Sequence, residues 1–272
     1  MTGVPPARGT SRRWGKALLR LVFALALPAV LVAVWWAASA GSTNVYWPPL
    51  RTVFGVFPDV WTGERLRGDV LPSVLRLAAG YTAAAVAGVA LGTVIGSRRR
   101  VRALCEPVLE FLRAVPPPVL VPVIMLFAGI GDTMKIAVIA SGCVWPVLLN
   151  TVEGVRAVDP VLAETARSYG VTGVARLRDV VLRSASPQIF AGLRQALSIG
   201  IILMVISEMF AASNGLGFTI VQFQRGFAIP DMWTGILLLG LLGFLLSVLF
   251  GLAERRVLGW YHGLRASGRR SP

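Results

Sequence analysis

The chain has few of the side chains that enzymes use most often. His262 is its only histidine, so there is no histidine pair for a zinc site and no serine–histidine couple for hydrolysis. Cys105 and Cys143 are its only cysteines, and they lack the CxxC spacing. We expect both to be packing residues rather than a disulfide. These absences count against an intramembrane enzyme, and we expect no metal site.

Lysine is equally scarce, because only Lys16 and Lys135 occur. A phosphate-binding loop needs the pattern GxxxxGK[ST], in which backbone amides and a lysine surround the phosphates. Neither lysine follows that pattern. The chain therefore cannot hydrolyse nucleotide by itself, and we expect it to bind no cofactor.

Charged residues make up only 15% of the chain, whereas hydrophobic residues make up 55%. Soluble domains average about 25% charged residues, and the mean hydropathy here is +0.70. Long uncharged stretches recur, and about 20 apolar residues cross a bilayer. The sequence therefore predicts an all-α polytopic membrane protein with about six transmembrane helices. We expect them near 16–40, 71–96, a third interrupted by proline, 134–151, 189–212 and 232–254.

The net charge of +14 is distributed in a way that argues against nucleic-acid binding. Most arginines lie in four clusters, at 8–20, 98–102, 156–183 and 255–270, which recur after every second predicted span. This follows the positive-inside rule. We expect a membrane protein with both termini in the cytoplasm.

The same pattern divides the chain into four parts. We expect a disordered N-terminus at 1–15, and a first helix with an external loop at 16–70. A helical core with a cytoplasmic loop at 152–188 then occupies 71–262, and a basic tail follows at 263–272. A short amphipathic helix is expected near 50–61.

The N-terminus also resembles an export signal, because Ser11–Lys16 has a twin-arginine pattern and Ala38–Ala40 resembles a cleavage site. The apolar stretch of 18–40 exceeds the 7–15 residues of a signal core. We therefore favour an uncleaved first helix.

Small residues and prolines predict how the core helices pack. Ala84, Gly88, Gly92 and Gly96 recur every four residues, which places a narrow groove on one helix face and favours close helix packing. The prolines at 116–118 and 122 must break the third helix, and broken backbone at membrane depth needs cover by protein or by a water-filled cavity.

Acids are scarce inside the predicted spans. Glu208 is the one candidate, and we expect it near the outer interface. Carriers driven by protons or sodium usually place acids or other ion-binding groups at mid-depth. The scarcity disfavours a self-sufficient carrier or channel, which remains the alternative.

The stretch from 159 to 187 is the most informative. Asp159-Pro160 can start a helix, with aspartate as the N-cap and proline in the first position. Gly170 can end it in a left-handed conformation, and Pro187 is expected to open the next span. From the residues alone, a docking helix and an ordinary loop between spans remain equal interpretations.

Glu164-Thr-Ala166, Gly170 and Val180-x-Leu182 are similar to the Glu-Ala-Ala loop of bacterial ABC-importer permeases, although Thr165 replaces an alanine and Arg183 a proline. Further motifs resemble the nitrate/sulfonate/taurine branch, and the resemblance covers about residues 45–262. These motifs are Leu112-Arg-Ala-Val-Pro-Pro117, Phe127-Ala-Gly-Ile-Gly131, Glu208-Met-Phe210 with Gly215-Leu-Gly217, and Glu254-Arg-Arg-Val-Leu258.

The resemblance implies a type I importer permease of the bacterial cytoplasmic (plasma) membrane. It implies a second permease copy, a cytoplasmic ABC ATPase dimer that uses the ATP, and an extracytoplasmic solute-binding protein. Membrane lipid headgroups or acids of the ATPase are the expected partners of Arg167, Arg176 and Arg178. The residues implied to couple the permease to the ATPase are Asp159, Glu164, Ala166, Gly170, Val180, Leu182 and Pro187.

The resemblance also suggests candidates for the pathway or its gate: Arg113, Pro117, Glu208, Gly215 and Gly217. Arg113 could attract an anionic solute or could serve a structural role beside Glu110. For the region of Glu208 and Gly215, gating, receptor docking and plain packing all remain open. Sulfonates, taurine, nitrate and pyrimidine-type vitamin precursors remain open as solutes.

Overall fold

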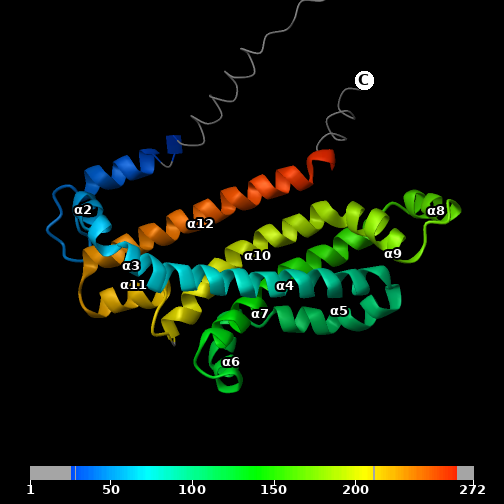
Figure 1. Cartoon of the computed structure of the whole chain (residues 1–272), viewed down its shortest axis with the longest axis horizontal. Coiled ribbons are helices and arrows are strands. Elements are labelled where there is room, and N and C mark those ends of the chain that lie inside the picture. The colour runs from blue at the N-terminus through cyan, green and yellow to red at the C-terminus, as the bar shows by residue number, and fades with distance from the viewer. Residues whose placement is uncertain (1–25, 28, 211, 262–272) are drawn as a thin grey trace, which may run out of the picture.

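Helices form all the regular structure of the described residues, which are 26–27, 29–210 and 212–261 of a computed structural model (Figure 1). The predicted all-α class is confirmed. The expected N-terminal disorder, the first part of the expected first helix (16–25), residue 28, His262 and the basic tail lie outside the described residues. The elements are α2 (Leu50–Val60), α3 (Gly63–Arg65), the π-helical turn η1 (Leu66–Val70), α4 (Leu71–Ser97), α5 (Arg99–Arg113), the 3-10 turn η2 (Pro117–Leu120), α6 (Val121–Ala128), α7 (Asp132–Arg156), α8 (Pro160–Ser168), α9 (Gly173–Ala175), the π-helical turn η3 (Arg176–Leu182), α10 (Arg183–Phe210), α11 (Leu216–Arg225) and α12 (Ile229–Val257).

Four helices in the described part are long and apolar enough to cross a membrane: Gly63–Ser97, α7, Gly173–Phe210 and α12. A fifth span arises if the bent pair α5 and α6 counts as one. The described remainder of the expected first helix is a short apolar helix, Ala29–Ser39. The total of six spans therefore stays a prediction. The five spans that the structure describes agree with the second to sixth spans expected from the sequence.

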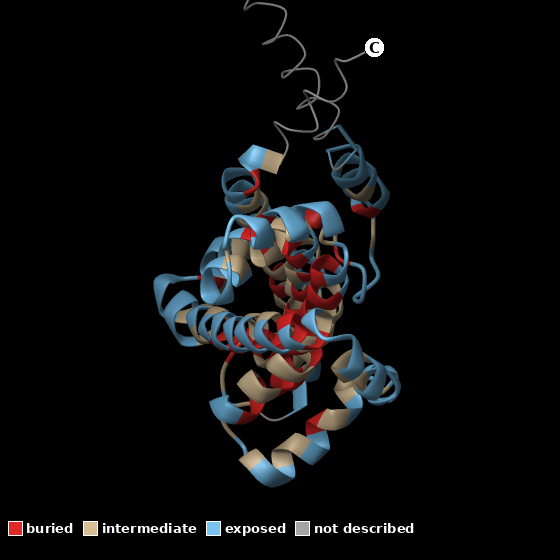
Figure 2. Ribbon diagram, turned by 90° about the vertical axis from the view of Figure 1, so that its right-hand side faces the viewer, coloured by how far each residue is buried: buried red, intermediate tan, exposed pale blue. Residues whose placement is uncertain are grey.

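The core lies where α4, α7 and α10 pack together, and α7 is the central helix because it contacts both others most extensively. Buried residues gather along the middle of the molecule, and exposed ones cover its outside (Figure 2). By contrast, α12 buries only residues near its start and leaves Phe244, Leu245 and Leu249 exposed. Such a surface suits lipid or another protein chain rather than water.

The groove of small residues on α4 receives α7, as the packing interpretation predicted. A Cβ atom added to Gly92 would lie 2.7 Å from the carbonyl oxygen of Leu148, and one added to Gly88 would lie 2.8 Å from Cβ of Val147. Only glycine permits so close an approach of the two backbones.

The predicted break in the third span is confirmed. α5 ends at Arg113, η2 begins at Pro117, and the two halves of the span meet at an angle of 83°. The prolines cause the break because they donate no backbone hydrogen bond and clash with the preceding turn.

The predicted start of the fifth span at Pro187 is wrong. The helix runs without a break from Gly173 to Phe210, and Pro187 lies inside α10. Proline removes the amide that would bond the carbonyl of Arg183, and that carbonyl accepts a hydrogen bond from Oγ of Ser186 at 2.8 Å instead. The helix thus tolerates the proline, and the segment between the long helices shrinks to 157–172.

Candidate functional site

Functional candidates lie at both ends of the bundle. We call the end that carries α8 the α8 end, and the opposite end, where α11 lies, the α11 end (Figure 1). α4 and α7 both begin at the α11 end, and α10 ends there.

α8 has a defined start. Oδ1 of Asp159 accepts a hydrogen bond from the backbone N–H of Val161 at 2.8 Å, and Pro160 occupies the first helical turn. The aspartate thereby satisfies a donor that the helix itself cannot pair. This confirms the predicted N-cap.

The end of α8 is equally well defined. Gly170 has φ of 73°, its N–H donates to the carbonyl of Arg167 at 3.0 Å, and the N–H of Val171 donates to that of Ala166 at 2.9 Å. This pair of bonds is the Schellman motif, which requires a left-handed residue such as glycine. The predicted helix end at Gly170 is confirmed.

α8 presents an uncovered surface. Ala166 is buried against the molecule, whereas Glu164 is exposed. Val161, Leu162 and Tyr169 are large apolar side chains that are also exposed. A short, firmly capped helix with exposed apolar residues around one acid has the character of a docking surface.

The other residues of the predicted coupling set lie beyond α8 in the sequence, in the helix that leads into α10. Val180 is buried, and Leu182 packs on the cluster formed by Val155, Ala185 and Ile189. These two residues hold the helix against the bundle, and Pro187 lies half-buried further along it. The structure therefore separates the set into a protruding part, 159–170, and a packing part, 180–187.

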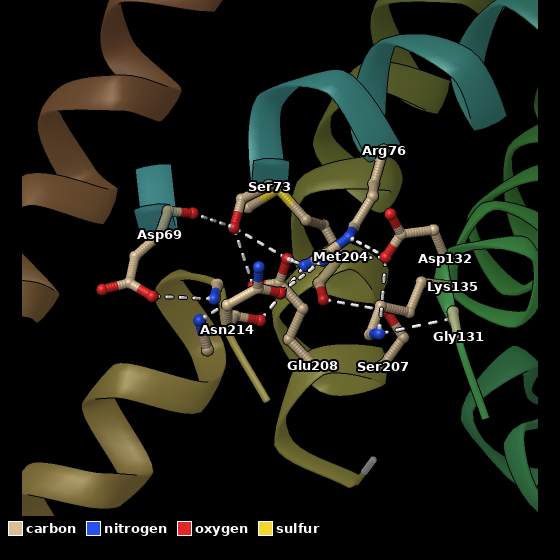
Figure 3. Close-up of polar contacts among 12 residues, drawn as sticks. Asp69, Ser73, Arg76, Gly131, Asp132, Lys135, Met204, Ser207, Glu208 and Asn214 are labelled. Carbon is tan, nitrogen blue, oxygen red and sulfur yellow. Dashed lines mark hydrogen bonds and ion pairs between the residues drawn. The ribbon is translucent and has the colours of Figure 1, made fainter. Parts of the chain in front are cut away.

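A network of polar side chains, of which Ser73, Arg76, Lys135 and Glu208 are buried, occupies the α11 end (Figure 3). We call it the Glu208 cluster; its members are Asp69, Ser73, Arg76, Asp132, Lys135, Glu208 and Asn214. They come from η1, α4, α7, α10 and the segment before α11. The cluster thus joins elements that are far apart in the sequence.

Glu208 lies at the centre of this cluster and is fully buried. Oε1 accepts from Nη1 of Arg76 at 2.9 Å, and Oε2 accepts from the N–H of Gly217 at 3.0 Å. Oγ of Ser73 lies 2.7 Å from Oε1. A buried carboxylate needs such partners, because an unpaired charge in an apolar interior is very costly.

Arg76 connects Glu208 to the other elements. Its Nε donates to Oδ1 of Asp132 on α7 at 2.8 Å, and its Nη2 donates to Oδ1 of Asn214 at 2.6 Å. Lys135, also buried, has Nζ 3.7 Å from the same Asp132 oxygen. The cluster thus holds two cations and three carboxylates, of which Asp69 pairs with neither cation but accepts from the N–H of Gly215 at 3.1 Å. Because each buried charge has a partner, the arrangement has the character of a structural joint.

Two glycines allow the chain to enclose this carboxylate. Gly215 has φ of 120°, and a Cβ atom there would lie 2.5 Å from Cδ of Glu208. A Cβ atom on Gly217 would lie 2.5 Å from the carbonyl oxygen of Val205. Both positions therefore require glycine.

The structure refines the expectation that Glu208 lies near the outer interface. Glu208 is near the end of α10, as expected, but its side chain is enclosed and cannot touch another protein directly. Sequence reasoning missed its partner Ser73 and the more distant members of the cluster, Asp69, Asp132, Lys135 and Asn214. The available signal was Arg76, a cation near the start of an apolar span, which must find an acid if it is buried.

The remaining candidates lie elsewhere. Arg113 lines a cavity of about 530 Å³ whose other residues are Glu110, Ala114, Trp145, Pro146, Leu149 and Gln195. Nε of Arg113 donates to Oε2 of Glu110 at 2.7 Å, as the structural interpretation expected. Pro117 packs near Gly142 instead. The five pathway candidates therefore form no single site.

The Arg113 cavity has polar walls at mid-span. Trp145 and Gln195 lie in the middle of α7 and α10, and Nδ2 of Asn150 donates to Oε1 of Gln195 at 3.3 Å. Polar and charged side chains that are accessible within the membrane-spanning region usually face a cavity or a partner protein rather than lipid.

Comparison with known proteins agrees with these features. The family described as the binding-protein-dependent transport system inner membrane component matches residues 84–259. The chain belongs to this family. The family match covers the broken third span, α8 and most of the Glu208 cluster.

Individual relatives show which members of the family the chain resembles. It is 31% identical to a putative aliphatic sulfonates transport permease, SsuC of Bacillus subtilis, over 91% of this chain and 88% of that one. It is 30% identical to the taurine transport system permease TauC of Escherichia coli, over 92% and 94%. The nitrate import permease NrtB of Synechocystis is 26% identical, over 85% and 86%. The predicted resemblance to this branch of ABC-importer permeases is confirmed.

A solved structure supports the fold. The inward-facing MetNI methionine ABC transporter aligns with a TM-score of 0.60 at 21% identity, covering 71% of this chain and 95% of that chain. At this identity the likeness concerns the fold alone, and it agrees with the type I importer architecture predicted from the sequence.

Proposed function

We propose that this permease imports a small anion of the sulfonate, taurine or nitrate type. The support is the agreement of three relatives whose names give these solutes. The Arg113 cavity adds a cation at mid-span that such an anion could approach. In this proposal a solute-binding protein delivers the solute, and a second copy of the chain completes the pathway.

The α8 end is proposed to face the cytoplasm. Arg98, Arg99, Arg100 and Arg102 lie at the junction of α4 and α5 on this end, and Arg255 and Arg256 lie in the last turn of α12. The excess of arginine supports this orientation through the positive-inside rule. In this proposal the end of α12 lies in the cytoplasm as well.

The observation that carries the proposal is the capped, exposed helix α8. In the proposed mechanism, α8 seats on a cytoplasmic ATPase, and ATP-driven movement of the ATPase displaces it. Because α8 connects α7 to the helix that becomes α10, its displacement acts on the central helices of the core. The ATPase can shift the permease between two states only if its contacts with α8 differ between them.

The proposal is tested by reconstituting the chain alone, with its ATPase, and with variants of α8. Glu164→Lys reverses the exposed charge, and Gly170→Pro removes both the left-handed residue and its N–H. We expect both variants to insert into the membrane but to lose ATPase association and uptake. Glu64→Lys, an exposed charge reversal in α3, is the matched control and should leave uptake unchanged. Uptake by the chain without any ATPase, or normal ATPase association of both variants, would contradict the proposal.

A further inference from the structure

A second cavity, of about 960 Å³, lies at the α8 end. α4, α5, α7, α8, α9 and η3 all contribute to its walls. The charged residues of the lining are Arg99, Arg102, Arg156 and Arg176, and no acid is among them. We call this space the arginine cavity.

Its arginines lack the partners that buried or clustered cations need. Within the described part of the chain, Arg99, Arg102 and Arg176 make no side-chain hydrogen bond or ion pair, and Nε of Arg176 is buried without a partner. Arg156 makes one loose contact, 3.5 Å from Glu153. Four like charges around one space repel each other unless an anion lies between them. The cavity is therefore incomplete without a negatively charged occupant.

The walls also indicate what kind of anion fits. Val155, Leu177, Val180 and Val181 form an apolar side of the same cavity. An ion such as free phosphate would leave this apolar surface uncovered, and its volume is far below that of the cavity. An amphipathic molecule with a phosphate group would satisfy both sides. Basic pockets between spans on the cytoplasmic side are known to suit anionic lipid headgroups.

The position of the cavity agrees with that chemistry. Gly96 and Ser97, at the end of the α4 span, and Val155, at the end of the α7 span, line it. These residues mark the depth at which the apolar spans give way to arginine, which is the depth of lipid headgroups. An acidic segment of an ATPase would have to reach past α8 to this depth.

We infer that the arginine cavity binds the phosphate headgroup of an anionic phospholipid. The headgroup phosphate lies among Arg99, Arg102 and Arg176, and the start of the acyl chains covers the apolar wall. Because Pro160 and Ala163 of α8 also line the cavity, the bound lipid contacts both the bundle and α8. Lipid binding itself does not depend on the proposed solute or ATPase.

The test measures binding of phosphatidylglycerol to the purified full-length chain by native mass spectrometry, with phosphatidylcholine as the neutral reference. The variant is Arg102→Gln with Arg176→Gln. Two exposed arginines outside the lining, Arg100→Gln with Arg255→Gln, give a control with the same change in net charge. Arg102→Lys with Arg176→Lys keeps the charge and checks that any loss is not a failure to fold.

We expect the chain and the control to prefer phosphatidylglycerol, and the glutamine variant to bind it about 30-fold more weakly, since each interfacial arginine contributes about a factor of five. The lysine variant should recover most of the binding, and inorganic phosphate should not displace the lipid. Equal binding by the glutamine variant and the control would overturn the inference. Displacement by inorganic phosphate would assign the site to a free anion, and displacement by the ATPase would assign it to an acidic segment of that protein.

Discussion

Arg76 and Glu208 form a buried ion pair across the α11 end, with Nη1 of Arg76 2.9 Å from Oε1 of Glu208. The two residues lie 132 positions apart in the sequence and join the start of α4 to the end of α10. Because Arg76 also contacts Asp132 of α7, one guanidinium connects the three core helices at this end.

Arg76→Ala is expected to lower the free energy of unfolding by about 3–5 kcal/mol, because it leaves the carboxylate of Glu208 buried without its cation. The measurement is denaturant unfolding of the purified chain in detergent. Arg113→Ala is the control: its pair with Glu110 is half-exposed on both sides, and loss of such a pair costs less than about 1 kcal/mol. Equal losses would show that the burial of the Arg76 pair has no energetic consequence.

Gly215→Ala is expected to destabilise the same region by about 1–3 kcal/mol, because the positive φ disfavours any Cβ atom and this one would collide with the Glu208 carboxylate. Gly226→Ala serves as the control. Gly226 has φ of −83°, and the contact of its added Cβ would be 3.4 Å. Thermal unfolding of the two variants should differ clearly, and similar midpoints would contradict the close packing of Gly215.

Gly92→Ala tests the contact between α4 and α7. Its Cβ would lie 2.7 Å from the carbonyl oxygen of Leu148, and a backbone atom in a packed helix cannot move aside without separating the helices. We expect a loss of about 1–3 kcal/mol. Gly240→Ala on α12, where nothing lies within 4 Å, should be neutral or slightly stabilising, because alanine favours helix. A neutral Gly92→Ala would mean that the helices separate easily.

Local rules explain most of what the sequence predicted correctly. Asp159-Pro160 and Gly170 act on the backbone beside them, so the limits of α8 could be predicted without knowledge of the fold. The proline break after Arg113 and the glycine groove of α4 follow from equally local sterics.

The features that the sequence did not predict have two different causes. The interior position of Pro187 has a local cause, because the hydroxyl of the adjacent Ser186 donates to the Arg183 carbonyl that the proline leaves free. The members of the Glu208 cluster, by contrast, come from five separate segments, and Ser73 is 135 positions away from Glu208. No local pattern encodes such a meeting, although the isolated cation Arg76 indicated that an acid was needed.

The cavity beside Arg113 permits a test of its two proposed roles. If Arg113 attracts the transported anion, Arg113→Gln should raise KM for that anion about tenfold by removing a contact of about 1.4 kcal/mol. Glu110→Gln should lower KM instead, because it frees the guanidinium of Arg113 from the carboxylate that it now binds.

If the pair of Arg113 and Glu110 is only structural, both variants should lose a similar amount of stability, and neither should change KM. Uptake by the reconstituted transporter, with whichever of the candidate anions the wild type imports, distinguishes the two outcomes, and unfolding midpoints of both variants provide the control for structural damage.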